Sequence, residues 1–418
     1  MAGGLAVSGA SLGGEAVGLR AEAGRIAELG PGVTAAPGDQ LLDGSGTALI
    51  AGFVNAHTHA AMTLFRGYAD DLALIEWLEQ HIWPAEEKLD AEDVYWGARL
   101  ACAEMIRTGT VRFWDMYWHP QATARAVEDS GLRATIGAPL IDGGQGSGLA
   151  ALQDAAATGL EALEESSDRI GAAFAPHAIY TVSPESLRWI GEESERLELP
   201  IQIHISETAG EVQACLATHG RRPVHHLDEL GMLGPRTLLA HAVWLDASER
   251  ELIAERGATI AVNPVANMKL AVGEIFNLPA ARELGIPIGL GTDGAGSNNS
   301  LDLLSDAKHL ALGQKHLAGN AAAVTAAEIL AVASGESAPL LGAQGLAVGA
   351  PADFLLVRLD DPGLALGSLA AGLVYAGLRG VVDTTVVDGR ILMRDGVVEG
   401  EPEIVARARE RAARLGLL

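Results

Sequence analysis

The sequence predicts an α/β protein, namely a closed (β/α)8 barrel of the TIM type with a smaller β unit beside it. Three observations support this prediction. The chain has 418 residues, which suits one large α/β domain plus a smaller one. Between residues 51 and 345, short apolar runs alternate with helix-like segments about eight times. The residues on either side form short β-like runs broken by Gly and Pro.

The predicted barrel strands are short apolar runs, and amphipathic segments follow them. The strands lie at 48–54, 111–115, 133–140, 170–175, 201–205, 237–240, 259–262 and 288–291. Helices are predicted at 120–130, at 149–166 and from residue 184 onward. This alternation is typical of parallel strands joined by helical crossovers.

The flanking segments contain the runs assigned to the smaller β unit. Before the barrel these runs cover 4–8, 16–21, 25–29, 40–43 and 48–50, within residues 1–50. After it they cover 353–358, 380–382, 384–387 and 390–393, within residues 346–400, with Asp388-Gly389 as a hairpin turn. Residues 401–418 are predicted to form a C-terminal helix, rich in Arg and Glu, with a solvated face.

Composition excludes several classes of function. The net charge of −25 repels phosphate backbones, so we expect no nucleic-acid partner. No segment is apolar over the length that a membrane span requires, and no signal peptide is recognisable. Cys102 and Cys215 are the only cysteines, which fits the reducing cytoplasm.

Two histidines follow the first predicted barrel strand. Side chains at positions i and i+2 of a strand point the same way, so His57 and His59 can reach one point in space. Such a pair can offer two imidazoles to one metal ion. An isolated His-x-His near a turn is usually incidental, so the rest of the chain decides its meaning.

Polar residues also end four later strands. They are His177, His204 with Glu207 just beyond it, His241, and Asp293. In a barrel, the carboxyl ends of the strands meet at one face, where active sites lie. Burying so many ionisable groups without a metal ion or a substrate is costly, so we expect these residues to form a site.

Three histidines and one aspartate suit a divalent cation, zinc above all, with iron as the alternative. An open coordination position would hold a water molecule and lower its pKa toward neutrality. Glu207 is placed to shuttle a proton, and His241 to hold the water or stabilise developing charge. The chain has no lysine between Lys88 and Lys269 that could bridge two metals as a carbamate, so we predict a single ion.

Several motifs resemble the amidohydrolase superfamily, and more narrowly the 5-methylthioadenosine/S-adenosylhomocysteine deaminase family and the related triazine chlorohydrolases. The matching segments are 55–59 (NAHTH), 65–67 (FRG), 83–86 (WPAE), 176–177 (PH), 204–208 (HISET), 263–270 (NPVANMKL), 291–300 (GTDGAGSNNS) and 352–354 (ADF). The resemblance covers nearly the whole chain. It implies that the flanking β segments form one composite β-sandwich beside the barrel.

The resemblance also implies roles for residues at the metal. His57, His59, His204 and Asp293 bind the ion. Glu207 takes a proton from the metal-bound water and delivers it to a ring nitrogen. His241 positions the hydroxide, and Asp293 passes a proton to the departing ammonia.

Three further residues match family positions that hold the substrate. Glu86 corresponds to a glutamate that accepts hydrogen bonds from ribose hydroxyls, although from the residues alone it is one of many helix carboxylates. Trp77 resembles a residue that packs on adenine, with a core tryptophan as the alternative. His177 is implied to touch the base or the sugar. Asn267 and Lys269 lie in a matching segment, but we assign them no role.

The chain departs from the family in one respect. Relatives that bind S-adenosylhomocysteine use arginines near the third strand to hold the amino-acid carboxylate, whereas residues 134–148 contain no arginine. We therefore expect a preference for adenosine-type nucleosides with a neutral 5′ group, such as adenosine, 5′-methylthioadenosine or 5′-deoxyadenosine.

Other functions remain open from the sequence. The heterocycle could instead be aminodeoxyfutalosine, guanine, an oxidised purine or a pterin. A triazine-type hydrolase is less favoured because Glu86 suits ribose. A metal-binding protein without catalysis is disfavoured because all the proton-transfer groups are present. By analogy with relatives, a homo-oligomer is possible.

Overall fold

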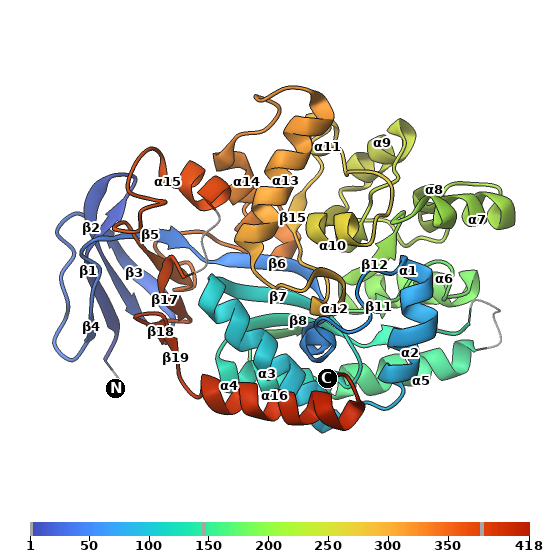
Figure 1. The fold of residues 1–418 in the computed structure, drawn as a ribbon, viewed down its shortest axis with the longest axis horizontal. Coiled ribbons are helices and arrows are strands. Elements are labelled where there is room, and N and C mark those ends of the chain that lie inside the picture. Colours follow the sequence, from blue (N-terminus) through green and yellow to red (C-terminus); the bar gives the residue numbers. More distant parts are fainter. Residues whose placement is uncertain (1–2, 144–147, 377–379) are drawn as a thin grey trace.

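A computed structural model describes residues 3–143, 148–376 and 380–418 of the chain (Figure 1). The barrel strands are β6 (Phe53–Thr58), β7 (Thr110–Met116), β8 (Arg133–Gly137), β9 (Pro139–Leu140), β10 (Ile170–Ala172), β11 (Ala175–Pro176), β12 (Ile201–Ile205), β13 (Thr237–His241), β14 (Thr259–Val262) and β15 (Ile288–Leu290). Their positions agree with the predicted α/β alternation. Within the described residues no helix is long and apolar enough to cross a membrane.

Parallel pairing runs around the barrel. β6, β7, β8 and β10 pair in this order, and so do β12, β13, β14 and β15. A parallel bridge between Phe174 and Ile201 links the two sets. The barrel closes where the backbone N–H groups of Thr292 and Asp293 donate to the carbonyl oxygen of His57, at N···O distances of 3.2 and 3.0 Å. The last strand end therefore lies against the first.

Three predicted strands are each divided in two. The apolar run 48–54 separates at Gly52 into β5 (Thr47–Ala51) and β6, and a Cβ on Gly52 would lie 2.3 Å from Val111 Cγ1. The run 133–140 breaks between β8 and β9, because Pro139 has no N–H and restricts the residue before it. The run 170–175 gives β10 and then β11, which pairs with β9.

Helices cover the outside of the barrel and its carboxyl-terminal face. They are α1 (Leu74–Trp77), α2 (Trp83–Glu86), α3 (Ala91–Thr108), α4 (Pro120–Ser130), α5 (Leu149–Glu161), α6 (Pro184–Leu197), α7 (Ala209–His219), α8 (Pro223–Glu229), α9 (Ala247–Arg256), α10 (Pro264–Lys269), α11 (Leu278–Glu283), α12 (Ala295–Asn298), α13 (Leu303–Ala318), α14 (Ala326–Ala333), α15 (Leu369–Ala371) and α16 (Glu401–Leu415). The predicted helix 120–130 is α4, and the predicted helix 149–166 ends early, at Glu161.

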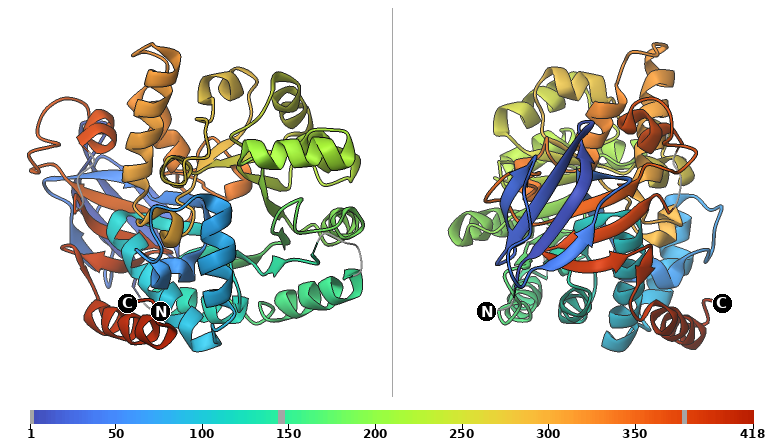
Figure 2. Two further views of the ribbon diagram at one scale, coloured as in Figure 1. Left: turned by 45° about the vertical axis from the view of Figure 1, so that its right-hand side comes forward. Right: turned by 90° about the vertical axis from the view of Figure 1, so that its left-hand side faces the viewer.

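The N- and C-terminal segments build one nine-stranded sheet with its own apolar core (Figure 2). Its strands are β1 (Leu5–Leu12), β2 (Glu15–Glu22), β3 (Arg25–Gly30), β4 (Gln40–Asp43), β5, β16 (Phe354–Arg358), β17 (Val382–Val387), β18 (Arg390–Arg394) and β19 (Val397–Val398). The central pair joins the two ends of the chain, because β5 pairs with β16 in antiparallel register. The blue and red strands lie side by side in Figure 2 for this reason.

The C-terminal helix α16 is less exposed than its composition suggested. Ile404, Ala408, Ala412 and Leu415 recur at helical spacing and are buried, and the helix packs along α3 (Figure 1). The guanidinium of Arg414 donates to the carboxylate of buried Asp93 in α3. The charged side chains thus cover one face of α16, while the other packs against α3.

Arg133 connects the sheet to the barrel. It lies in β8, and its side chain is only 9% exposed. Its Nε donates to Asp353 Oδ2 at 2.7 Å, and its Nη2 donates to Asp388 Oδ1 at 2.9 Å. Both carboxylates belong to the C-terminal part of the sheet, so one barrel side chain binds two points on it.

Replacing Arg133 with Gln should lower the free energy of unfolding by about 2 to 3 kcal/mol, because Asp353 and Asp388 would lose the cation that pairs with both. Urea unfolding followed by circular dichroism measures this change. The matched control is Arg221→Gln, which removes an exposed ion pair with Glu229 and should cost at most about 0.5 kcal/mol. Equal losses in the two variants would contradict the connecting role of Arg133.

Candidate metal centre and active site

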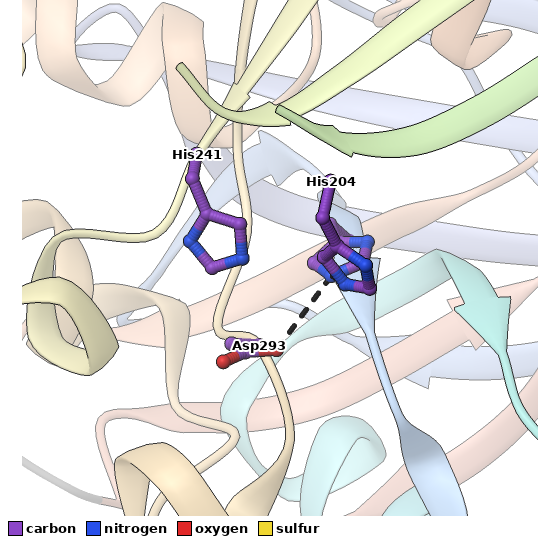
Figure 3. Close-up of side chains that lie close together, drawn as sticks. His204, His241 and Asp293 are labelled. Atoms are coloured by element: carbon purple, nitrogen blue, oxygen red, sulfur yellow. Dashed lines mark hydrogen bonds and ion pairs between the residues drawn. The ribbon is translucent and has the colours of Figure 1, made fainter. Parts of the chain in front are cut away.

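The predicted site residues meet at the carboxyl-terminal face of the barrel. His57 lies in β6, His204 in β12 and His241 at the end of β13, while Asp293 follows β15. Figure 3 shows His204 and His241 from β12 and β13 converging with Asp293 from the loop after β15. All of the predicted site residues except His57 line one cavity, and His57 is fully buried beside it. These residues are far apart in sequence, and the barrel brings them together.

The four predicted ligands place their donor atoms at short, similar distances. His204 Nε2 lies 3.1 Å from His57 Nε2 and 3.3 Å from His59 Nε2. Asp293 Oδ1 lies 3.2 Å from His59 Nε2 and 3.6 Å from His57 Nε2. Four donors about 2.0–2.1 Å from a central zinc-type ion would be about 3.3 Å apart in a tetrahedron. The spacing therefore fits one ion.

In the imidazole rings of His59 and His204, a hydrogen bond at Nδ1 leaves the lone pair of Nε2 facing the other expected ligands. His59 Nδ1 lies 2.6 Å from the carbonyl oxygen of Met116, and His204 Nδ1 lies 2.8 Å from that of His177. A carbonyl can only accept, so Nδ1 carries the proton in each ring and Nε2 is left as a base. The buried Oδ1 of Asp293 lies 3.2 Å from His59 Nε2 and faces the same point. Lone pairs that face one another in this way require a cation.

The electrostatics of the site point the same way. Burial opposes charge on His59, yet the hydrogen bond and charge of Asp293 outweigh burial and raise the pKa of His59 to about 9. Burial would raise the pKa of Asp293, but His57 and His59 hold that pKa well below its usual range. Burial lowers the pKa of His57 to about 4. The group thus attracts one positive charge, and a divalent ion would replace the proton on His59.

The backbone at three strand ends adopts a left-handed conformation. The φ angles of Ser206, His241 and Asp293 are 49°, 71° and 60°. Residues other than glycine adopt such angles at a cost of about 1 to 3 kcal/mol each, and they cluster at functional sites. A hydrogen bond of 2.5 Å from Ser297 Oγ to Asp293 Oδ2 holds the carboxylate so that Oδ1 faces the histidines.

His241 and Glu207 adjoin the four donors. Donor atoms of His57, His204, His241 and Asp293 all lie within 4.8 Å of one another, so His241 belongs to the same cluster as the expected ligands. Glu207 Oε1 lies 3.6 Å from His241 Nδ1. Glu207 is buried, and burial raises the pKa of its carboxyl group. A buried carboxylate with a raised pKa is suited to accept and return a proton.

The structure assigns positions to two residues that the sequence left without a role. Asn267 Oδ1 lies 2.8 Å from His241 Nδ1, so the side chain of Asn267 orients the His241 ring. Lys269 Nζ donates to Asp70 Oδ1 and Asn299 Oδ1, both at 2.6 Å. Lys269 therefore ties the segment before α1 to α12, and this segment leads to the cavity wall.

The outer part of the cavity holds the three residues expected to contact substrate. Glu86 is half-buried, and its Oε2 accepts a hydrogen bond of 3.2 Å from Trp118 Nε1. Trp77 is buried in the core and also lines the cavity, and its packing on adenine stays a prediction. His177 Nδ1 lies 3.0 Å from Thr181 Oγ1. Trp118 was not predicted, although its position just after the strand 111–115 could have indicated it.

A second, larger cavity of about 1070 Å³ adjoins the first. The two share Glu86, Trp118 and Ile141 among their lining residues, so Glu86 stands where one opens into the other. Part of the segment that lacks arginine, residues 144–147, lies outside the described residues.

Comparison with known proteins agrees with this metal-binding barrel. A model of the amidohydrolase family matches residues 48–392. The chain is 45% identical over 383 residues to a 5′-deoxyadenosine deaminase from Methanoregula boonei, covering 90% of this chain and 86% of that protein. It is 42% identical over 403 residues to 5-methylthioadenosine/S-adenosylhomocysteine deaminase 1 from Archaeoglobus fulgidus, covering 95% and 94%. The chain belongs to the amidohydrolase family.

Solved structures agree with the fold. A crystal structure of an adenosine deaminase from Xanthomonas campestris with bound zinc superposes with a TM-score of 0.90 at 31% sequence identity. That comparison covers 100% of this chain and 99% of the other. The family, the fold and the buried donor group together support one divalent metal ion in this chain.

The purified chain should contain one divalent ion, and His204→Ala should lose it, because His204 Nε2 contacts two other expected ligands. Elemental analysis after gel filtration measures the metal per chain. His309→Ala is the matched control, since His309 is exposed and its ring bonds the carbonyl oxygen of Ser305, away from the cluster. Full metal content in His204→Ala would contradict this assignment of the centre.

Proposed function

We propose that the chain is a metal-dependent deaminase that hydrolyses the amino group of an adenine nucleoside, releasing ammonia and the inosine analogue. The family and the names of the relatives indicate a hydrolase that acts on C–N bonds. One observation carries the proposal: a buried carboxylate, Glu207, adjoins the metal-ligand cluster in a cavity whose outer part contains Glu86. A proton-transfer group and a ribose-binding group thus line one space.

The ligand set we propose is His57, His59, His204 and Asp293, with zinc as the ion. The short distances among their donor atoms support this set. Zinc is bound in the adenosine deaminase structure that is 31% identical to the chain, and nitrogen-rich sites suit it, with iron as the alternative. When bound, such an ion activates a water molecule as the nucleophile.

The proton transfers are assigned to residues of the chain. Glu207 accepts a proton at its carboxylate and donates it to the ring nitrogen next to the carbon that is attacked. His241 holds the attacking oxygen, because Asn267 accepts from Nδ1 and leaves Nε2 free toward the cavity. Asp293 accepts the remaining proton of the attacking water at its carboxylate and passes it to the leaving amine, which departs as ammonia.

Substrate contacts are assigned to the outer cavity. Glu86 accepts hydrogen bonds from the ribose 2′- and 3′-hydroxyls, and the bond from Trp118 holds its carboxylate in place. Trp77 packs against the adenine ring, and His177 contacts the base or the sugar. Burial lowers the pKa of His177 to about 4, so its ring is neutral and can either donate or accept.

We propose that the 5′ group is uncharged. Among the described residues that line the adjoining larger cavity, the one arginine is Arg125, and its guanidinium lies 3.4 Å from Glu92 and stacks on Tyr95. A substrate carboxylate would therefore meet no free guanidinium there. The relative that is 45% identical is named for 5′-deoxyadenosine, whose 5′ group is a methyl.

Two coarser assignments complete the proposal. Residues 51–345 are assigned to the metal-dependent hydrolase barrel, residues 1–50 and 346–400 to the composite β-sandwich, and residues 401–418 to the C-terminal helix. Cys102 and Cys215 are free and buried, which supports a reducing compartment such as the cytoplasm.

Glu207→Gln should reduce kcat by about 10² to 10⁴, because the amide cannot accept the proton that the carboxylate accepts. Ammonia release from 5′-deoxyadenosine measures kcat, and elemental analysis should find the metal content unchanged. The nearby variant Glu198→Gln is a surface control and should behave as wild type. An unchanged rate in Glu207→Gln would remove Glu207 from the mechanism.

A substrate panel tests the proposed class. Among amines that include guanine and a pterin, kcat/KM should be highest for 5′-deoxyadenosine or 5′-methylthioadenosine. S-adenosylhomocysteine should be poorer, because its carboxylate would lose water without gaining a cation. Spectrophotometric assays at saturating metal give the ranking. Highest efficiency on S-adenosylhomocysteine would contradict the neutral 5′ group, and activity only on another heterocycle would contradict the nucleoside.

A further inference from the structure

Glu211 occupies an unusual position at the start of α7. Its carboxylate accepts two backbone hydrogen bonds of 2.8 Å, from Ser206 N–H to Oε1 and from Glu207 N–H to Oε2. The side chain is buried, with 8% of the residue exposed. Glu211 therefore binds the backbone of Glu207, the residue to which the proton transfer is assigned.

Other helices of the chain use the same kind of residue differently. In α3, α9 and α14, the acid at the third helical position accepts a hydrogen bond from the N-cap residue, which completes a capping box. In α7 the N-cap Thr208 accepts from Glu211 N–H at 3.1 Å, so half of the box is present. The carboxylate, however, reaches past Thr208 to the two residues before it. Ordinary capping does not explain this reach.

The turn at Ser206 and Glu207, which Glu211 binds, is also strained. Ser206 has a φ angle of 49°, and it lies between the ligand strand β12 and Glu207. A non-glycine residue keeps such an angle only when its surroundings determine it. The two bonds to Glu211 supply that restraint, and they set the direction in which the Glu207 side chain leaves the backbone. The result is the approach of Glu207 Oε1 to within 3.6 Å of His241.

We propose that Glu211 is a positioning residue, which holds the Ser206–Glu207 turn so that the Glu207 carboxylate faces the reacting atoms. This inference rests on the proposed function. A loss of position by about 1 Å can cost about a hundredfold in rate. Glu211 does not line the cavity that contains Glu207 and the metal-ligand cluster, so its effect on the reaction passes through Glu207.

The test compares two buried acids at the third position of a helix, Glu211 in α7 and Glu249 in α9. In Glu211→Gln, the amide NH2 faces a backbone N–H, so one bond is replaced by repulsion between two donors. We expect kcat on 5′-deoxyadenosine to fall about a hundredfold, with KM and the metal content nearly unchanged. In Glu249→Gln the melting temperature should fall while kcat stays within about twofold of wild type.

A second variant and a double-mutant cycle distinguish a loss of positioning from misfolding. Glu211→Asp keeps the carboxyl group but is one methylene too short to reach both N–H groups, so its kcat should fall as well. Glu211→Gln should lower kcat by a much smaller factor in a Glu207→Asp background than in the wild type. The reason is that the effects of two residues are not additive when one acts through the other.

Several results would overturn the inference. One is a normal kcat in both Glu211 variants, and another is an equal loss of kcat in Glu249→Gln. The inference would also fail if kcat of the Glu211 variants fell in proportion to their metal content, or if the kcat losses of Glu211→Gln and Glu207→Asp multiplied in the double variant. A wild-type chain that is inactive on every nucleoside of the panel would overturn the proposed function, and this inference with it. An active wild type whose Glu211 variants keep full kcat would overturn this inference alone.

Discussion

The structure depends on one electrostatic constraint, the convergence of histidine lone pairs and a carboxylate in a buried space. Nε2 atoms of His57, His59 and His204 lie close together with Asp293 Oδ1, at distances of 3.1 to 3.6 Å where they are in contact. Without a positive charge such an arrangement is repulsive and costly to bury. A divalent ion would make the same arrangement attractive, and it would link the first strand of the barrel to the loop after the last.

Hydrogen bonds from surrounding groups orient the side chains of this arrangement. Carbonyl oxygens of Met116 and His177 orient two imidazoles, Ser297 orients the aspartate, and Asn267 orients His241. Met116 and His177 lie at strand ends, whereas Ser297 and Asn267 lie in the short helices α12 and α10 that follow later strands. Left-handed backbone at three strand ends is held by the rigid sheet below, which concentrates strain where the chemistry is proposed.

Much of the fold could be predicted because its periodicity is local. Strands β12 and β14 and helix α4 begin and end at the residues predicted from the sequence. The predicted strands 133–140 and 170–175 were too long, because a run of apolar residues does not reveal where pairing changes partner. The solvated face predicted for α16 is present, but the buried face that packs on α3 was not predicted, since charge content says little about how a helix is oriented.

The sequence by itself determined which donor types stand at strand ends, since side-chain direction alternates along a strand and a barrel gathers those ends at one face. The tertiary structure decided how those groups meet. Which imidazole nitrogen faces inward depends on a carbonyl from another strand, and the roles of Asn267 and Lys269 depend on contacts across loops. Even the reach of Glu211, four residues beyond Glu207, depends on a backbone turn that no residue pattern specifies.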